Sequence, residues 1–159
     1  RGGLERPGFE IIAAGAGREG RMGHIRLRKY NTKDAFPEQK LDNDLCWIVK
    51  AGRRIYIRGQ TGRIWGTDQM IGAEDIAAQA DNAMQNMDVL LKEAGARWAD
   101  VCGVRLYVSD RAYVVPVTNA VGRWLKGVYP TMSVLIIKGF ARPQYGMEVD
   151  LDVVLSDGD

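Results

Sequence analysis

The helix that decides the fold is residues 73–95, AEDIAAQADNAMQNMDVLLKEAG. Its apolar side chains recur at helical spacing and form one stripe: Ile76, Ala80, Ala83, Met87, Leu90 and Leu91. Such a stripe is typical of a helix that packs one side against a core. Gly95 predicts the end of the helix, because glycine readily takes the left-handed conformation of a C-terminal cap. We therefore predict a helix over residues 73–94 that covers one face of a larger unit.

Apolar runs on both sides of this helix predict strands. The predicted strands are residues 24–30, 45–50, 54–57, 101–108, 132–137 and 147–155. A second helix is predicted from Ser109-Asp110, which can cap it, to about Leu125, with Pro116 in its first turn. Two helices with this many strands predict an α+β fold, with both helices on one face of a mixed sheet.

The run Met132–Ile137 is apolar on both of its sides, as expected of a buried strand. Two helices are enough to cover only one face of a sheet. The uncovered apolar surface therefore predicts oligomerisation, because burial of apolar surface stabilises by ~25 cal/mol per Å².

The composition of the chain indicates a soluble protein with one domain. The chain has 159 residues, 46% hydrophobic and 26% charged, which is ordinary for one soluble domain. No apolar run approaches the ~20 residues of a membrane span, and the sequence near Arg1 lacks the layout of a signal peptide. Cys46 and Cys102 are too few for a disulfide framework or a zinc site. We expect a cytoplasmic protein without metal or cofactor.

Charge and glycine are unevenly distributed. Residues 1–40 hold nine Lys/Arg and five Asp/Glu, a net +4, and the rest hold thirteen and fifteen, a net −2. A basic cluster at residues 18–29 can bind phosphates, but without aromatic platforms a solvated face is the preferred interpretation. Seven of the nineteen glycines fall in residues 1–23, which favours loop over core. We predict a Gly-rich, basic extension over 1–40, a domain over 41–155 and a tail over 156–159.

Several landmarks of the domain stand in an order that resembles one family. They are Val49-Lys50-Ala51-Gly52, Ile55-Tyr56-Ile57-Arg58-Gly59-Gln60, Gln79, Asn86, Ala94-Gly95, Asp110, Asn119, Tyr129-Pro130, Ala141-Arg142-Pro143 and Met147-Glu148-Val149-Asp150. The ordered set covers roughly residues 41–155 and is similar to the Rid family, the reactive intermediate deaminases, also known as YjgF or endoribonuclease L-PSP proteins.

This resemblance implies a chorismate-mutase-like fold and a homotrimer whose subunits join sheet to sheet, with three ligand clefts between them. Active members hydrolyse enamines and imines to 2-keto acids and ammonia. In those members an arginine two residues after the Tyr/Phe-Pro step binds the substrate carboxylate, for which a planar guanidinium is suited. A glutamate of the last strand orients the attacking water, which makes Glu148 the predicted catalytic residue.

The chain departs from the family pattern around the cleft. Met132 stands where the family has its arginine, so the usual carboxylate anchor is missing. Leu45 and Cys46 replace the usual Tyr-Ser, whereas Asn119 is retained. We predict that these four residues, together with Arg58, line the substrate site.

Arg58 stands where most relatives have a serine that faces the cleft. One interpretation is that it returns a guanidinium to the cleft from a different wall. The other is that it points outward, or pairs with a carboxylate such as Glu148 or Asp150. The sequence leaves both open.

Three functions remain in view. The first is a divergent hydrolase acting on a small enamine, imine or related metabolite at the subunit interface. The second is a non-catalytic trimer that binds a metabolite or a partner protein in the same cleft. The third, RNA binding or cleavage, is least favoured, because His24 is the single histidine and few aromatic residues are placed to stack on bases. No membrane partner is expected.

Overall fold

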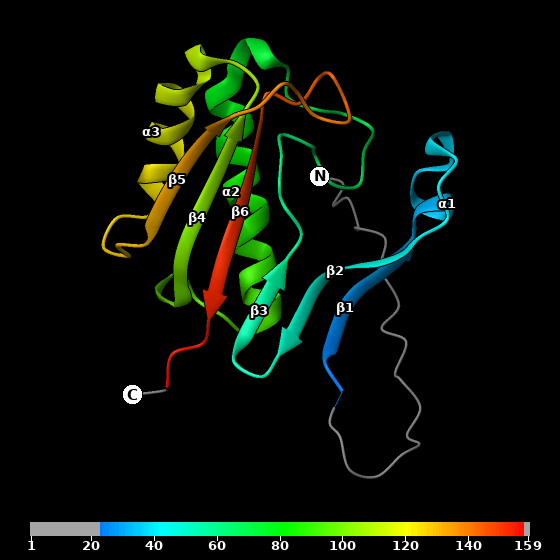
Figure 1. Cartoon of the computed structure of the whole chain (residues 1–159), viewed down its shortest axis with the longest axis vertical. Helices are drawn as coiled ribbons and strands as arrows, with labels where there is room; N and C mark the ends of the chain where they lie inside the picture. Colours follow the sequence, from blue (N-terminus) through cyan, green and yellow to red (C-terminus); the bar gives the residue numbers. More distant parts are fainter. Residues whose placement is uncertain (1–22, 158–159) are drawn as a thin grey trace, which may run out of the picture.

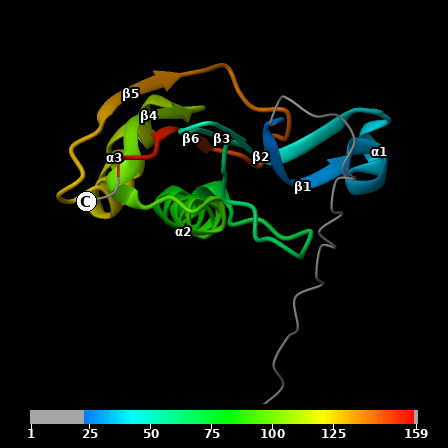
Figure 2. The same ribbon diagram turned by 90° about the horizontal axis from the view of Figure 1, so that it is seen from below.

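The computed structural model describes residues 23–157 and shows one mixed sheet with two helices on one face (Figures 1 and 2). The strands are β1 (Ile25–Asn31), β2 (Asp44–Ala51), β3 (Arg54–Ile57), β4 (Val101–Val108), β5 (Thr131–Ile136) and β6 (Met147–Val154). The helices are α1 (Thr32–Ala35), α2 (Ile76–Ala94) and α3 (Val114–Trp124). Short 3₁₀ turns are Pro37–Gln39, Ala73–Asp75, Trp98–Asp100 and Arg111–Tyr113. The predicted α+β fold is confirmed.

The order of strands across the sheet is β1-β2-β3-β6-β4-β5. β4 and β5 are parallel, because α3 carries the chain back between them, and all other neighbours are antiparallel. The last strand, β6, is inserted in the middle of the sheet, between β3 and β4. This position places Glu148, at the beginning of β6, opposite Tyr107 of β4 and close to the segment that leaves β3.

Capping residues mark both ends of α2 and the start of the turn that leads into α3. Asp75 caps α2 by accepting the Ala78 N–H at 3.0 Å, and Gly95 ends it with φ +76°. The predicted start at residue 73 is a 3₁₀ turn, whereas the predicted end is confirmed. Asp110 caps the 3₁₀ turn before α3 rather than α3 itself, by accepting the Ala112 N–H at 2.8 Å. Among residues 23–157, no helix combines the length and apolar character needed to cross a bilayer.

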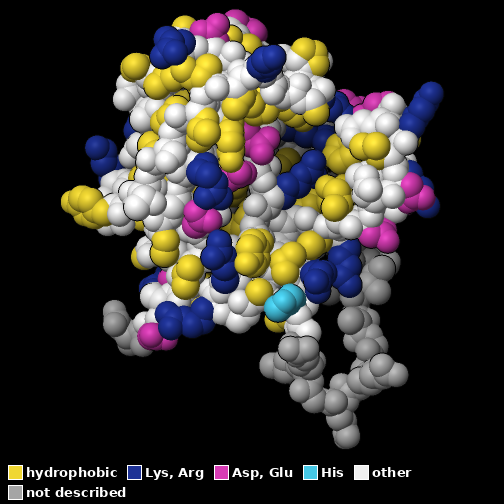
Figure 3. Space-filling view, viewed as in Figure 1, with side chains coloured by type: hydrophobic (Ala, Val, Ile, Leu, Met, Phe, Trp, Pro, Cys, Tyr) yellow, Lys and Arg dark blue, Asp and Glu magenta, His cyan; other side chains and the backbone are white. Residues whose placement is uncertain are grey.

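The core lies between the helices and the sheet. On β6, every second residue faces α2 and is at most 4% exposed: Met147, Val149, Leu151 and Val153. The intervening residues Glu148, Asp150 and Asp152 occupy the opposite face, where Asp152 pairs with Arg105 at 2.6 Å. Figure 3 views this uncovered face and shows charged and apolar side chains mixed across it.

β5 is an edge strand, so the run at residues 132–137, predicted to be a buried strand, is not buried within one subunit. β4 pairs with one of its edges, and no strand within residues 23–157 pairs with the other. Met132, Leu135 and Ile136 are 37%, 42% and 44% exposed. An apolar run shows that a strand needs cover, but it does not show that the cover comes from the same subunit.

The predicted edge strand near the N-terminus is confirmed as β1, which pairs with β2 along its length. The Arg28 guanidinium packs against two indoles that contact each other, 5.2 Å from the Trp47 ring and 4.8 Å from the Trp65 ring. It also forms an ion pair with Glu93 of α2 at 2.8 Å. The β1–β2 pair is thereby tied to the rest of the domain. The boundary at residue 40 stays a prediction, and the Gly-rich residues 1–22 lie outside the described residues.

Candidate functional site

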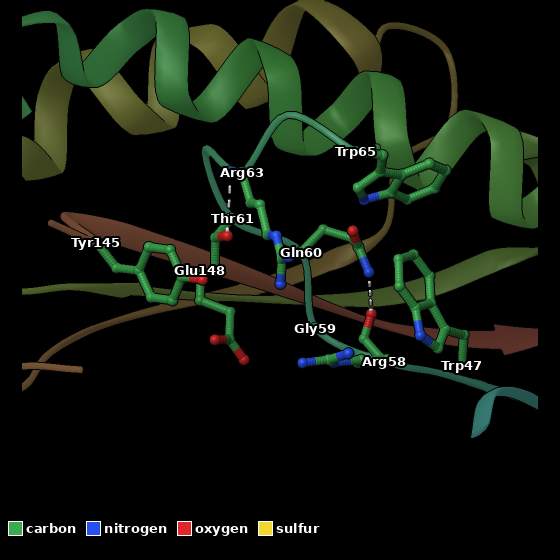
Figure 4. Close-up of a pocket in the computed structure, with 9 residues that line it drawn as sticks. All are labelled: Trp47, Arg58, Gly59, Gln60, Thr61, Arg63, Trp65, Tyr145 and Glu148. Carbon is green, nitrogen blue, oxygen red and sulfur yellow. Dashed lines mark hydrogen bonds between the residues drawn. The ribbon is translucent and has the colours of Figure 1, made fainter. Parts of the chain in front are cut away.

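A cavity of two adjoining lobes opens where the chain leaves β3, beside β6 and the segment that joins β1 to β2. The tryptophan lobe has a volume of about 130 Å³ and is lined by the nine residues of Figure 4, Trp47 and Trp65 among them. The phenylalanine lobe, about 300 Å³, includes Phe36 and Leu45. Four residues line both lobes: Arg58, Arg63, Tyr145 and Glu148. The hollow is visible in Figure 3 between the part of the chain that carries α1 and the rest of the molecule.

Glu148 is held close to the backbone at Gly59. A Cβ atom at residue 59 would lie 2.2 Å from Glu148 Oε1 and 2.6 Å from Asp150 Oδ1, so only glycine leaves room for these carboxylates. Burial raises the pKa of Glu148, the negative charge of Asp150 raises it further, and the positive charge of Arg58 opposes both. A carboxylate with a raised pKa accepts a proton more readily near neutral pH, as a general base requires.

Arg58 enters the cavity directly after β3. Its N–H donates to the Trp47 carbonyl at 2.8 Å, and its own carbonyl accepts the Gln60 side-chain amide at 2.9 Å. Its guanidinium lies over three aromatic rings, 5.3 Å from Tyr30, 5.5 Å from Phe36 and 5.5 Å from Trp47. Arg58 is exposed, lines the same cavity as Glu148 and forms no ion pair with any described carboxylate. Its role toward a substrate stays a prediction.

Arg63 is a second guanidinium of the cavity, and the sequence reasoning missed it. The Arg63 carbonyl accepts hydrogen bonds from Asn82 at 2.9 Å and from Asn86 at 3.2 Å, both on α2. These bonds fix the segment after Gln60, so the side chain reaches over Phe36 with its guanidinium carbon 4.9 Å from the ring. The only signal in the sequence was a basic residue directly after Gly-Gln-Thr-Gly.

Arg142 approaches the same ring from a third segment. Its guanidinium carbon lies 5.8 Å from the Phe36 centroid, and it forms an ion pair with Glu38. Arg142 was recognised as a landmark of the family but not as a cavity residue. Phe36 was missed because it falls in the predicted N-terminal extension, where no periodicity marks it.

Gln79 connects α2 to the segment that leads into β6. This fully buried side chain donates to the carbonyls of Ile71 and Gln144, at 2.7 and 3.0 Å, and accepts the Gly146 N–H at 3.0 Å. These bonds position the chain just before Glu148. The glutamine landmark thus supports the wall of the cavity rather than its interior.

The remaining predicted site residues are spread over the subunit. Leu45 lines the phenylalanine lobe. Cys46 is half-buried on β2, Asn119 is exposed on α3, and Met132 lies at the beginning of β5. None of these three lines the cavity within one subunit. Their assignment to a cleft between subunits stays a prediction.

The six-stranded mixed sheet with two helices on one face is a YjgF-like α+β fold. The chain belongs to the Endoribonuclease L-PSP family, whose model matches residues 43–155. A similar protein is Protein DfrA of Myxococcus xanthus, 24% identical over 106 residues, which are 67% of this chain and 78% of that protein.

Solved structures agree on the fold. A member of the YjgF/YER057c/UK114 family from Mycobacterium tuberculosis is 22% identical, with a TM-score of 0.66 over 84% of this chain and 100% of that one. RidA from the Antarctic bacterium Psychrobacter sp. PAMC 21119 is 21% identical, with a TM-score of 0.64 over 70% of this chain and 88% of that one. At such identities the likeness establishes the fold, and the site has to be interpreted from its own residues.

Proposed function

We propose that this protein binds a small metabolite that carries both a carboxylate and an enamine or imine group. The cavity holds this substrate, and Glu148 orients the water that hydrolyses the enamine or imine. One observation carries the proposal. The Arg58 guanidinium and the Glu148 carboxylate line the same cavity, yet the two side chains do not form an ion pair within the described structure. Each is therefore available to a ligand.

In this proposal Arg58 binds both oxygens of the substrate carboxylate. Glu148 accepts a hydrogen bond from a water molecule and takes its proton as the oxygen bonds to the imine carbon. The C=N electron pair moves to nitrogen, which receives that proton from Glu148. The carbinolamine then collapses to a carbonyl group and ammonia, so that one imine and one water give one ketone and one ammonia.

The position of Met132 narrows the substrate. A thioether binds no carboxylate, so the anchor that the family resemblance places there is absent. Losing a charged, hydrogen-bonded anchor commonly costs ~2–5 kcal/mol. We therefore expect little hydrolysis of 2-aminoacrylate-type imines. We expect a preference for substrates whose carboxylate binds to Arg58 instead of to a residue at position 132.

Assembly as a homotrimer is part of the proposal. It is supported by the exposed apolar residues of the β5 edge, Met132, Leu135 and Ile136. Light scattering at micromolar concentration should give three subunits, and Leu135→Glu should lower the mass because it places a charge in the apolar contact. A monomeric parent protein would refute the trimer.

The function is tested by ammonia release from a panel of imines and amidic metabolites. The parent protein should release ammonia from at least one of them, while Arg58→Ser and Glu148→Gln should not. Arg123→Gln is the matched control, because Arg123 is exposed on α3 and away from the cavity. Release that is unaffected by either cavity substitution would refute the proposal.

The second candidate, binding without turnover, is favoured by one observation, the methionine at position 132. In that case small carboxylates bind the parent protein and bind Arg58→Ser more weakly, but no compound of the panel yields ammonia.

A further inference from the structure

Two guanidiniums converge on one aromatic ring. The guanidinium carbons of Arg58 and Arg63 lie 5.5 and 4.9 Å from the Phe36 centroid, so one small ligand can contact both. They come from different sides of the Gln60 turn, and Figure 4 shows both ends directed into the space beside the Glu148 carboxylate.

Neither guanidinium forms an ion pair with a carboxylate of the described residues, although the charge of Arg58 acts on Glu148. Two of the ion pairs found there engage nearby arginines, Arg142 with Glu38 and Arg28 with Glu93, and none engages Arg58 or Arg63. Their neighbours include aromatic rings, which offer no carboxylate or carbonyl oxygen, so the guanidinium N–H groups can donate to a ligand.

One carboxylate cannot satisfy both groups bidentately, because it offers two oxygens and one guanidinium can bind both of them. A second anionic group on the same ligand satisfies the second guanidinium. Both guanidiniums contact Phe36, and Leu45 of the same lobe offers an exposed apolar surface to the carbon chain that separates the anionic groups. The phenylalanine lobe, at about 300 Å³, has the volume of a small metabolite site.

We propose that the ligand of this cavity is a small dicarboxylate, with one carboxylate bound by Arg58 and the other by Arg63. This inference rests on the proposed function, since it names the substrate class of the same site. Glu148 opposes the extra negative charge, and Arg142, on the same ring, is already paired with Glu38. The second charge-assisted pair should strengthen binding by about 10- to 100-fold over a ligand with one carboxylate.

The test compares ligands that differ by one negative charge and have nearly the same size. Titration calorimetry on the full chain would measure succinate against succinamate and glutarate against glutaramate, in which an amide replaces one carboxylate. We expect at least one dicarboxylate to bind about 10-fold or more tightly than its monoamide. The third ligand is 4-phosphonobutyrate, in which a phosphonate replaces one carboxylate of glutarate. If it binds more tightly than glutarate, the second group is a phosphate and the dicarboxylate assignment is overturned.

Matched variants assign the second anionic group to its arginine. Arg63→Gln should bring the dicarboxylate to the affinity of its monoamide and leave the monoamide nearly unchanged. Arg63→Lys should retain part of the preference because it keeps the charge, and Arg123→Gln should retain all of it. Circular dichroism and thermal unfolding would confirm that each variant is folded.

The two proposals fail in different ways. If a dicarboxylate and its monoamide bind the parent equally, and Arg58→Ser weakens both, the dianion inference is wrong and the proposed site stands. The same holds if Arg63→Gln weakens both ligands by the same factor. If none of these compounds binds the parent protein, both the inference and the proposed carboxylate site are wrong.

Discussion

The two faces of β6 differ in nearly every physical property although they alternate along eight residues. The face toward α2 carries Met147, Val149, Leu151 and Val153, all buried in the core. The other carries three partly exposed carboxylates: Glu148 lines the cavity, Asp152 pairs with Arg54 and Arg105, and Asp150 lies close to Gly59. Because side chains of a strand alternate, stability and proposed chemistry are assigned to odd and even positions of one segment. Substitutions on the two faces should therefore have separable effects.

Glu148→Gln should have the largest effect on activity. It keeps the size of the side chain but removes the group that takes the proton from water, so the rate of ammonia release should fall by about 100- to 10,000-fold. The free energy of unfolding should stay near that of the parent, as followed by urea titration. Equal rates for the two proteins would show that Glu148 is not the base.

On the opposite face, Leu151→Ala should lower the free energy of unfolding by about 2–5 kcal/mol, because it leaves a cavity in a packed core. Urea titration would measure the loss. Leu45→Ala is the control, since Leu45 is 48% exposed and should cost far less. A loss at residue 151 no greater than that at residue 45 would contradict the assignment of this face to the core.

Gly59→Ala tests the close contact between the Glu148 carboxylate and the backbone at residue 59. The new methyl group would meet Glu148 Oε1 at 2.2 Å, so the carboxylate must move, and activity should fall by about 10- to 100-fold. Gly122→Ala on α3 is the matched control, because its Cβ would meet no atom within 4 Å. A fully active Gly59→Ala protein would show that the position of Glu148 is not critical.

The smallest effect is on the pH dependence of stability. Burial first, and then the neighbouring acidic residue, raises the pKa of Glu148 in the folded state above its ordinary value of 4.5. The folded state therefore binds the proton more tightly, so Glu148 favours folding below pH 4.5, and this contribution is lost as the pH rises through the folded pKa. Relative to the parent, Glu148→Gln should gain stability as the pH rises through this range. A difference that stays constant with pH would contradict the raised pKa.

The spacing of apolar residues and the capping residues predicted those helices and strands whose bounds depend on neighbouring residues in the sequence. The bounds of β4 at residues 101–108 and the end of α2 at Gly95 agree with the structure, because apolar spacing and a glycine cap act within a few residues. The edge position of β5 was missed, since an apolar run does not identify its partner.

Only part of the cavity could be predicted, and the reason is again physical. Glu148, Arg58 and Leu45 were proposed through family landmarks, and all three line it. Arg63 and Phe36 were not, because their meeting depends on the fold of two segments that are distant in sequence. Neither segment has a spacing that marks a ligand site.

The edge-to-face contact of Trp47 and Trp65, with ring centroids 4.9 Å apart, has an optical consequence. Both indoles border the tryptophan lobe, whereas Trp98 and Trp124 form a separate pair whose N–H groups donate to Asp88 and Asp81 of α2. Indole emission responds to the water and charge around the ring. A ligand that displaces water from the lobe should thus change the fluorescence of the first pair and leave the second as an internal reference. The protein carries its own reporter of occupancy, without a dye or a label.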